Sequence, residues 1–123
     1  MTRILIAEDD PDIREMIDAK LSELGYETVA VADGEAALRE CTEQTFDLAV
    51  LDIMMPGMSG METLKLLRRN EWFAEMPVVL VTALTSEYDI KRGYEEGASL
   101  YLTKPFSLAA LAERVETLLT PVS

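Results

Sequence analysis

Apolar and polar positions alternate along the chain in blocks that predict five strands and five helices. Short apolar runs bounded by polar or turn residues predict strands at 3–8, 27–32, 46–52, 76–81 and 100–103. Between these runs, apolar residues recur three or four positions apart, which is typical of helices that bury one face. These helices are expected over 11–24, 34–41, 59–67, 86–97 and 108–119.

A strict strand–helix alternation predicts a parallel sheet with helices on both faces. The run Leu48–Leu51 lacks alternation, as expected for a central strand buried on both sides. We therefore predict an α/β flavodoxin-like doubly wound (βα)5 three-layer sandwich with strand order 2-1-3-4-5. Residues 1–120 are expected to form one domain, with 121–123 as a tail or truncated linker. Trp72 and Phe73 are expected to cover the core together.

Composition narrows the chemistry. The net charge of −12 argues against direct binding to nucleic acid or to an anionic membrane. The single cysteine, Cys41, and the lack of a signal peptide or long apolar run predict a soluble, cytoplasmic protein. With no histidine, Ser-His-Asp and Cys-His catalysis and His-ligated zinc are impossible. A metal here would be a hard cation such as Mg²⁺, Mn²⁺ or Ca²⁺.

Polar residues follow four of the predicted strands at their carboxyl ends, where open α/β sheets place their chemistry. They are Glu8, Asp9, Asp52, Thr82 and Lys104. Each alone is compatible with a structural role as a cap, a turn residue or a solvated side chain. Together they favour one site, because three converging carboxylates repel unless a cation offsets them. Carboxylate, Mg²⁺, ammonium and hydroxyl are the groups that phosphoryl transfer onto Asp52 would need.

The same residues carry a resemblance to a known family over essentially the whole chain. The sequence resembles the receiver domain of bacterial two-component response regulators. The matching residues are Glu8-Asp9, Asp52 with Met55-Pro56-Gly57 and Gly60, Thr82-Ala83, and Lys104-Pro105-Phe106. The set is specific, whereas any one of its elements is weak.

The resemblance implies that Asp52 is the phosphoacceptor and that a histidine kinase or phosphotransfer protein is the donor. It implies Mg²⁺ (with Mn²⁺ as an alternative) bound by Asp9, Asp52 and the Met54 carbonyl, with Glu8 acting through water. Lys104 would pair with the phosphoryl oxygens. The domain would catalyse its own phosphorylation and slow dephosphorylation, and would not be a turnover enzyme.

The resemblance also implies a switch that regulates an unknown output domain or protein. The Thr82 hydroxyl would move to bond the phosphoryl group, and Tyr101 would swing inward. The surface formed by the fourth helix, the fifth strand and the fifth helix would then change. The Lys104-Pro105 peptide would be cis.

Two features distinguish this chain within the resemblance. Met54 and Leu84 stand where family side chains flank the attacking water, and neither can orient it, so we expect slow loss of phosphate. Uncharged residues also replace the charged dimer contacts common in the DNA-binding subfamily: Ile90, Ser99, Leu100 and Ala110. An apolar patch for a different partner or dimer is one interpretation, and incidental surface hydrophobicity is the other; the patch would comprise Ile90, Tyr94, Leu100 and Tyr101.

Two other functions are compatible with this fold. An Mg²⁺-dependent phosphohydrolase with an aspartyl nucleophile would need a second acid/base carboxylate and a substrate-covering cap, and the sequence predicts no cap. A flavin-binding module would place a phosphate against the acidic strand ends, which would repel it. The cognate kinase, the output partner and the oligomeric state do not follow from the sequence.

Overall fold

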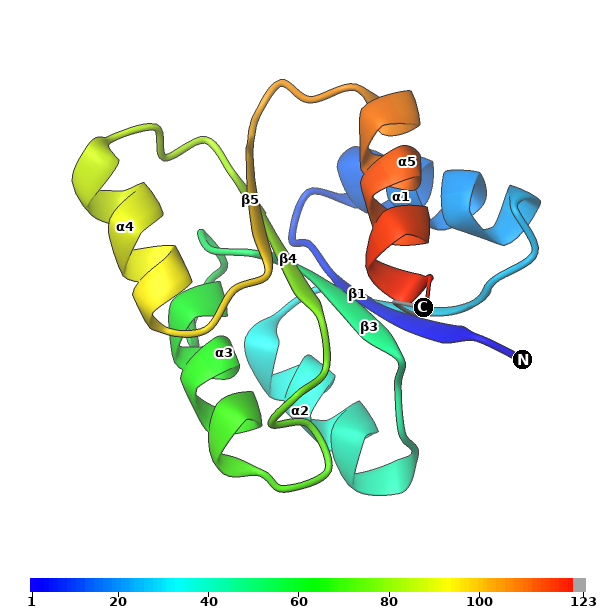
Figure 1. The fold of residues 1–123 in the computed structure, drawn as a ribbon, viewed down its shortest axis with the longest axis horizontal. Coiled ribbons are helices and arrows are strands. Elements are labelled where there is room, and N and C mark those ends of the chain that lie inside the picture. The colour runs from blue at the N-terminus through cyan, green and yellow to red at the C-terminus, as the bar shows by residue number, and fades with distance from the viewer. Residues whose placement is uncertain (121–123) are drawn as a thin grey trace.

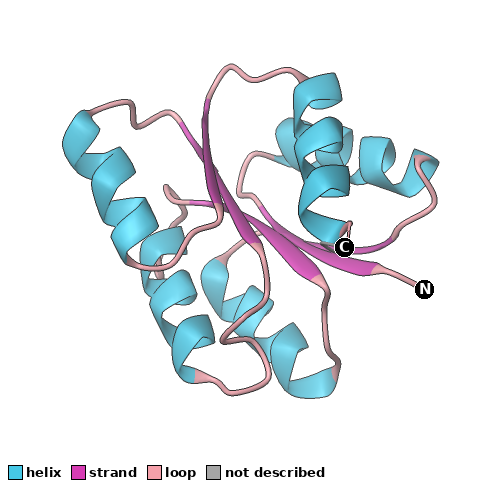
Figure 2. Cartoon of the chain, viewed as in Figure 1, coloured by secondary structure: helices cyan, strands magenta, loops and turns pink. Residues whose placement is uncertain are grey.

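The computed structural model describes residues 1–120 as alternating strands and helices (Figures 1 and 2). The strands are β1 (Arg3–Ala7), β2 (Glu27–Val31), β3 (Leu48–Asp52), β4 (Val78–Thr82) and β5 (Leu100–Thr103). The helices are α1 (Pro11–Glu23), α2 (Gly34–Glu43), α3 (Gly60–Arg69), α4 (Glu87–Glu95) and α5 (Leu108–Leu119). The expected tail at 121–123 lies outside the described residues. Among the described helices, none has the length and apolar character to cross a membrane.

The five strands form one parallel sheet in the order β2-β1-β3-β4-β5, which confirms the predicted fold class. In the register, Ala7 on β1 pairs with Leu51 on β3, and Asp52 pairs with Val81 on β4. Because all strands run the same way, their carboxyl ends lie along one edge of the sheet. The residues that follow β1, β3, β4 and β5 are thereby brought to the same side of the molecule.

Two apolar layers hold the helices against the sheet. In Figure 1, α1 and α5 lie on one face and α2, α3 and α4 lie on the other. Alternate residues of β3 divide between the layers, since Val50 packs with α1 and α5 while Leu51 packs with α2 and α3. All five β3 residues are buried, which explains the unbroken apolar run in the sequence.

The helices differ in how firmly they are anchored. Asp10 caps α1 as predicted, because its carboxylate accepts the backbone N–H groups of Asp12 and Ile13. Ser59 and Ser86 cap α3 and α4 in the same way. The α4 helix buries only one residue, Gly93, in agreement with the weak amphipathic pattern of its sequence. It is therefore the helix with the least burial to hold it in place.

Some predicted boundaries were wrong by one or two residues. The third strand begins at Leu48, not Phe46. Just before it, the Asp47 carboxylate accepts the backbone N–H of Arg3 at 2.9 Å, in place of a backbone carbonyl. The fourth strand begins at Val78, not Met76, and extends to include Thr82.

The predicted hydrophobic lid of two aromatic residues is half wrong. Phe73 is 1% exposed and belongs to the core under α3, as expected. Trp72 is 74% exposed and is not part of that core. Of the two neighbouring aromatic side chains after α3, only Phe73 covers the core.

This difference predicts unequal costs for matched substitutions. Replacing Phe73 by alanine should lower the free energy of unfolding by about 3–5 kcal/mol, because it opens a cavity in the core. Replacing Trp72 by alanine should change it by no more than about 0.5 kcal/mol. Urea unfolding of both variants measures the contrast, and equal losses would contradict the assignment of Phe73 alone to the core.

Candidate functional site

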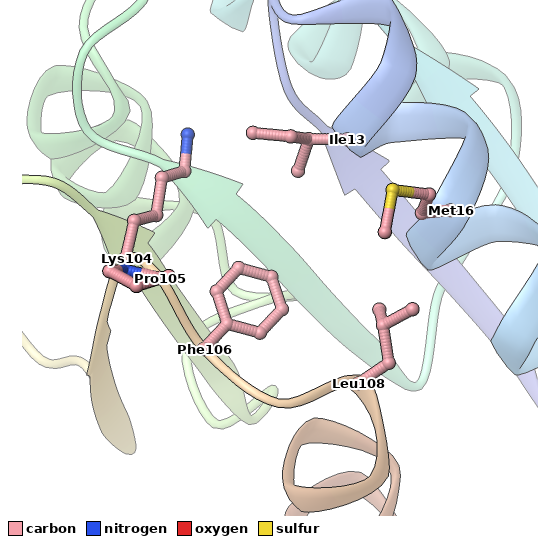
Figure 3. A pocket seen from close by; sticks show the side chains of 6 residues that line it. All are labelled: Ile13, Met16, Lys104, Pro105, Phe106 and Leu108. Carbon is pink, nitrogen blue, oxygen red and sulfur yellow. The ribbon is translucent and has the colours of Figure 1, made fainter.

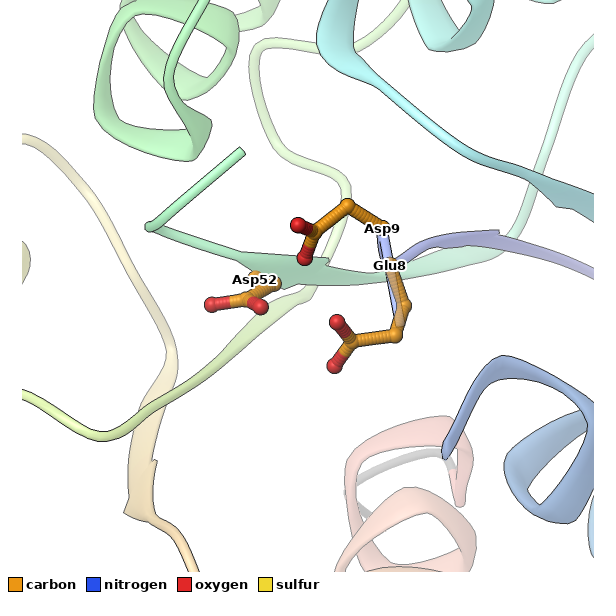
Figure 4. A group of neighbouring side chains, drawn as sticks. All are labelled: Glu8, Asp9 and Asp52. Carbon is orange, nitrogen blue, oxygen red and sulfur yellow. The ribbon is translucent and has the colours of Figure 1, made fainter. Parts of the chain in front are cut away.

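Three carboxylates meet at the carboxyl edge of the sheet, as the sequence predicts. Glu8 and Asp9 follow β1, and Asp52 ends the neighbouring strand β3. One carboxylate oxygen from each residue lies within 4.8 Å of the other two (Figure 4). Glu8 and Asp52 are buried, whereas Asp9 is exposed. The cluster thus has a closed floor and one open side.

Asp52 is held by one donor at each oxygen. The backbone N–H of Met54 donates to Oδ1 at 3.0 Å, and Lys104 Nζ donates to Oδ2 at 2.9 Å. The turn that supplies the Met54 N–H folds tightly back on β3. A methyl group at Gly60 would lie 2.1 Å from the Asp52 carbonyl oxygen, so only glycine fits this close approach.

Glu8 is more deeply enclosed and incompletely satisfied. Its Oε2 accepts the backbone N–H of Asp10 at 3.1 Å, and Lys104 Nζ forms an ion pair with Oε1 at 2.8 Å. Beyond this ion pair, the buried Oε1 has no hydrogen-bond partner among the described residues. An unsatisfied buried carboxylate oxygen next to two more carboxylates is what a cation ligand would look like.

Burial and neighbouring charges shift the pKa values of Glu8 and Lys104. Burial raises the pKa of Glu8 from 4.5 to about 7, and the nearby Asp52 carboxyl adds to the rise, against the opposing effect of Lys104. Burial alone would lower the pKa of Lys104, but its carboxylate partners Glu8 and Asp52 outweigh that effect and raise it. Lys104 therefore stays charged while Glu8 changes charge near neutral pH.

Thr82 and Tyr101 lie on the adjoining strands. Thr82 is fully buried at the end of β4, and its hydroxyl oxygen accepts the backbone N–H of Leu84 at 3.3 Å. Tyr101 on β5 is 8% exposed, and its hydroxyl donates to the Leu84 carbonyl at 2.9 Å. The aromatic ring thus already occupies the inward position that the resemblance assigns to the phosphorylated form. The Lys104-Pro105 peptide is cis, which confirms that expectation.

The residues of the cluster fit a hard divalent cation. Carboxylate oxygens are the ligands that Mg²⁺ prefers, and Mg²⁺ commonly uses one or two carboxylates while keeping several waters. The exposed side of the cluster, at Asp9, leaves room for those waters. The unsatisfied oxygen of Glu8 gives an acceptor for one of them.

An apolar hollow of about 370 Å³ adjoins the site on the side of α1 and α5 (Figure 3). It is lined by Ile13, Met16, Lys104, Pro105, Phe106 and Leu108. Met16 is 52% exposed, although it is large and apolar. The aliphatic stem of Lys104 borders the hollow, while its ammonium group reaches the carboxylates.

Of the two interpretations of the apolar residues on the fourth helix and fifth strand, a single patch is not present as one surface. Tyr101 is buried, and only Tyr94 is clearly exposed, at 45%. Ile90 packs against the core layer under α2 and α3, whereas Leu100 packs against the layer under α1 and α5. These two residues lie on opposite faces of the sheet and cannot form one patch.

Comparison with known proteins shows the family of this chain. Residues 4–116 match the family described as the response regulator receiver domain, and the chain belongs to that family. It is 42% identical over 120 residues to the transcriptional activator protein PfeR of Pseudomonas aeruginosa, covering 98% of this chain and 38% of PfeR. The chain spans about half the length of several other curated relatives that it matches.

Solved structures give the same result. The chemotaxis protein CheY4 of Vibrio cholerae superposes with a TM-score of 0.91 at 32% identity, covering 97% of this chain and 99% of that one. The response regulator protein TrrA of Thermotoga maritima, in complex with Mg²⁺-BeF, superposes with a TM-score of 0.85 at 35% identity, covering 97% and 100%. Receiver domains are phosphorylation-regulated signalling domains, so the signalling interpretation is favoured over the phosphohydrolase and flavin alternatives.

Sequence reasoning missed one residue of the site. Arg14, on the first turns of α1, donates from Nη1 to the Glu8 carbonyl at 3.0 Å and so ties the acidic loop to the helix. An arginine on a helix usually extends into solvent, and nothing in its spacing shows which way a long side chain bends. Only the path of the loop after β1 reveals this contact.

The raised pKa of Glu8 predicts how stability depends on pH without Mg²⁺. Between pH 4.5 and about 7 the folded protein holds a proton on Glu8 that the unfolded chain releases. Glu8 therefore stabilises the fold below pH 4.5, and that contribution is lost as the pH rises through about 7. Urea unfolding across this range should show a steeper fall for wild type than for Glu8→Gln. Identical pH profiles for the two proteins would contradict the assignment.

Proposed function

We propose that this domain accepts a phosphoryl group on Asp52 and uses it to change the surface around α4. The observation that carries the proposal is the arrangement of Lys104, whose ammonium lies 2.9 Å from Asp52 Oδ2 and 2.8 Å from Glu8 Oε1. One cation is shared by two buried carboxylates beside a third. The excess of negative charge suits a divalent cation and makes the site ready for phosphoryl transfer, which depends mostly on positioning and charge neutralisation.

Residues of this chain would orient the attacking carboxylate and stabilise the transferred group. Asp52 is oriented by the Met54 N–H and by Lys104, which each donate to one oxygen of its carboxylate. A carboxylate oxygen attacks phosphorus, the bond between phosphorus and the donor's imidazole nitrogen breaks, and the electron pair stays on that nitrogen. Lys104 then pairs with the phosphoryl oxygens. Asp9, Asp52 and the Met54 carbonyl would hold Mg²⁺, with Glu8 acting through water, and the ion would neutralise the charge of the incoming group.

The switch would begin at Thr82. Its hydroxyl oxygen is an acceptor in this arrangement, so the hydroxyl proton is available to donate to a phosphoryl oxygen. Tyr101, whose ring already faces inward, would then be held in that position, because its hydroxyl and the Thr82 hydroxyl bond the same residue, Leu84. Phosphorylation would raise the population of the arrangement that binds the group best, and α4 would respond because it is weakly anchored.

We also propose the partners. The donor is a histidine kinase or a phosphotransfer protein, which would cover the apolar hollow beside Lys104 while it reaches Asp52. The output is a separate domain or protein that reads the surface of α4, β5 and α5; a dimer through this surface is an alternative. We propose a signalling role without turnover of an external substrate, in the cytoplasm, with no direct contact of this domain to nucleic acid.

The role of Asp52 can be tested with small phosphoryl donors. Acetyl phosphate with Mg²⁺ should add one phosphoryl mass to wild type and none to Asp52→Asn, because an amide is not a nucleophile for this reaction. Beryllofluoride should likewise shift the NMR signals of Thr82 and Tyr101 in wild type alone. Equal mass gain or equal shifts in both proteins would remove Asp52 from the proposed role.

The side chains beside Asp52 predict slow loss of phosphate. Met54 is 55% exposed at the open side of the site and cannot orient an attacking water. Wild type phosphorylated by acetyl phosphate should therefore keep its phosphoryl group for minutes or longer, and Met54→Gln should lose it several-fold faster. Met16→Gln is a matched control, since Met16 is 52% exposed but lies on α1. A wild-type half-life of seconds would contradict the prediction.

A further inference from the structure

Gly93 is the one residue that α4 buries, and it lies against the ring of Tyr101. A methyl group at Gly93 would be 2.9 Å from Tyr101 Cδ2, 3.1 Å from Tyr101 Cε2 and 3.1 Å from Leu80 Cδ1. The first distance is shorter than carbon atoms approach without something moving. The inward ring of Tyr101 therefore occupies the space that a side chain at position 93 would fill.

Helix stability alone does not explain a glycine at this position. In a helix interior, glycine is less favourable than alanine. Gly93 also has an ordinary helical backbone, unlike the glycines of this chain that adopt a positive φ. What sets it apart is the contact with Tyr101. Glycine here weakens a helix that is already poorly anchored and leaves room for one aromatic ring.

That ring connects the site to α4 through a chain of direct contacts. The Leu84 N–H donates to the Thr82 hydroxyl at 3.3 Å, and the Tyr101 hydroxyl donates to the Leu84 carbonyl at 2.9 Å. At its other end, the Tyr101 backbone N–H donates to the Tyr94 hydroxyl at 3.2 Å, and the ring rests on Gly93. A continuous path therefore runs from Thr82 to two successive residues of α4.

We propose that Gly93 is a positioning residue: it leaves space for the Tyr101 ring and thereby lets α4 respond to the phosphoryl group. This inference rests on the proposed function, because the path matters only if Thr82 binds a phosphoryl group on Asp52. A side chain at position 93 would displace the ring, not the helix. Leu80 is fully buried, whereas Tyr101 lies on the edge strand β5 and can rotate towards solvent.

Gly93→Ala tests whether the Tyr101 ring needs the space that glycine leaves. In the metal-free protein, the Tyr101 ring should become more accessible to solvent, as measured by paramagnetic broadening of its NMR signals by a soluble relaxation agent. The apparent affinity for beryllofluoride in saturating Mg²⁺ should fall roughly 5-fold or more, the usual scale of coupling between sites. Affinity for Mg²⁺ alone should stay unchanged, because the carboxylates are not touched.

A double-mutant cycle separates this role from a general packing defect. In a Tyr101→Ala background there is no ring to displace, so adding Gly93→Ala should raise the free energy of unfolding through better helix propensity and leave the beryllofluoride affinity as it is in Tyr101→Ala. The same fold-loss in both backgrounds would overturn the proposal. So would wild-type affinity and wild-type ring exposure in Gly93→Ala.

Asp52→Asn keeps the two levels of inference apart. If Asp52→Asn bound beryllofluoride as tightly as wild type, the phosphoacceptor assignment would fail. The solvent exposure of the Tyr101 ring in metal-free Gly93→Ala would still show whether Gly93 positions that ring. If Asp52→Asn lost binding while Gly93→Ala kept both wild-type properties, the phosphoacceptor assignment would stand and the role of Gly93 would be wrong.

Discussion

The shared ion pair of Lys104 with Asp52 and Glu8 is the interaction on which the site depends. Three carboxylates lie close together there, and a single ammonium offsets only part of their charge. The remaining imbalance can be relieved by a proton on Glu8 or by an added cation. These are two answers to the same electrostatic problem, so proton and cation should compete for the site. A phosphoryl group adds negative charge, and it can be held only when a cation supplies what Lys104 alone cannot.

The three carboxylates can be held close together because the rest of the domain is well packed. Two apolar layers bury both faces of β3, so the strand that carries Asp52 is fixed on both sides. The tight approach of Gly60 to the Asp52 carbonyl then turns the following loop so that the Met54 N–H reaches the carboxylate. Like charges stay close because the backbone has no freedom to separate them, and Arg14 fixes the loop that carries Glu8.

The sequence predicts most of the fold and the site because both follow from local patterns. Unbroken apolar runs identify buried parallel strands, and polar residues at their ends then have to meet at one edge. What the pattern does not contain is the direction of single side chains. Trp72 and Phe73 are neighbours of similar character, yet Trp72 is exposed and Phe73 is buried. Ile90 and Leu100 look like one apolar patch but pack on opposite faces of the sheet. Gly93 is a further case, because only the structure shows that the Tyr101 ring occupies the space beside it.

Weak anchoring of α4 sets the size of the signal that the site has to deliver. Moving a two-state equilibrium from 1:99 to 99:1 needs about 5.5 kcal/mol of differential binding. A hydrogen bond to a charged group contributes about 1.5–3 kcal/mol, so new bonds from Thr82 and Lys104 to a phosphoryl group would give about 3–6 kcal/mol. Lys104 must loosen its present contacts with Glu8 and Asp52 to make its share, which lowers the net gain. The response is therefore large only if the moving part resists little. A helix that buries a single glycine meets that condition, and a helix fixed by several large buried side chains would not.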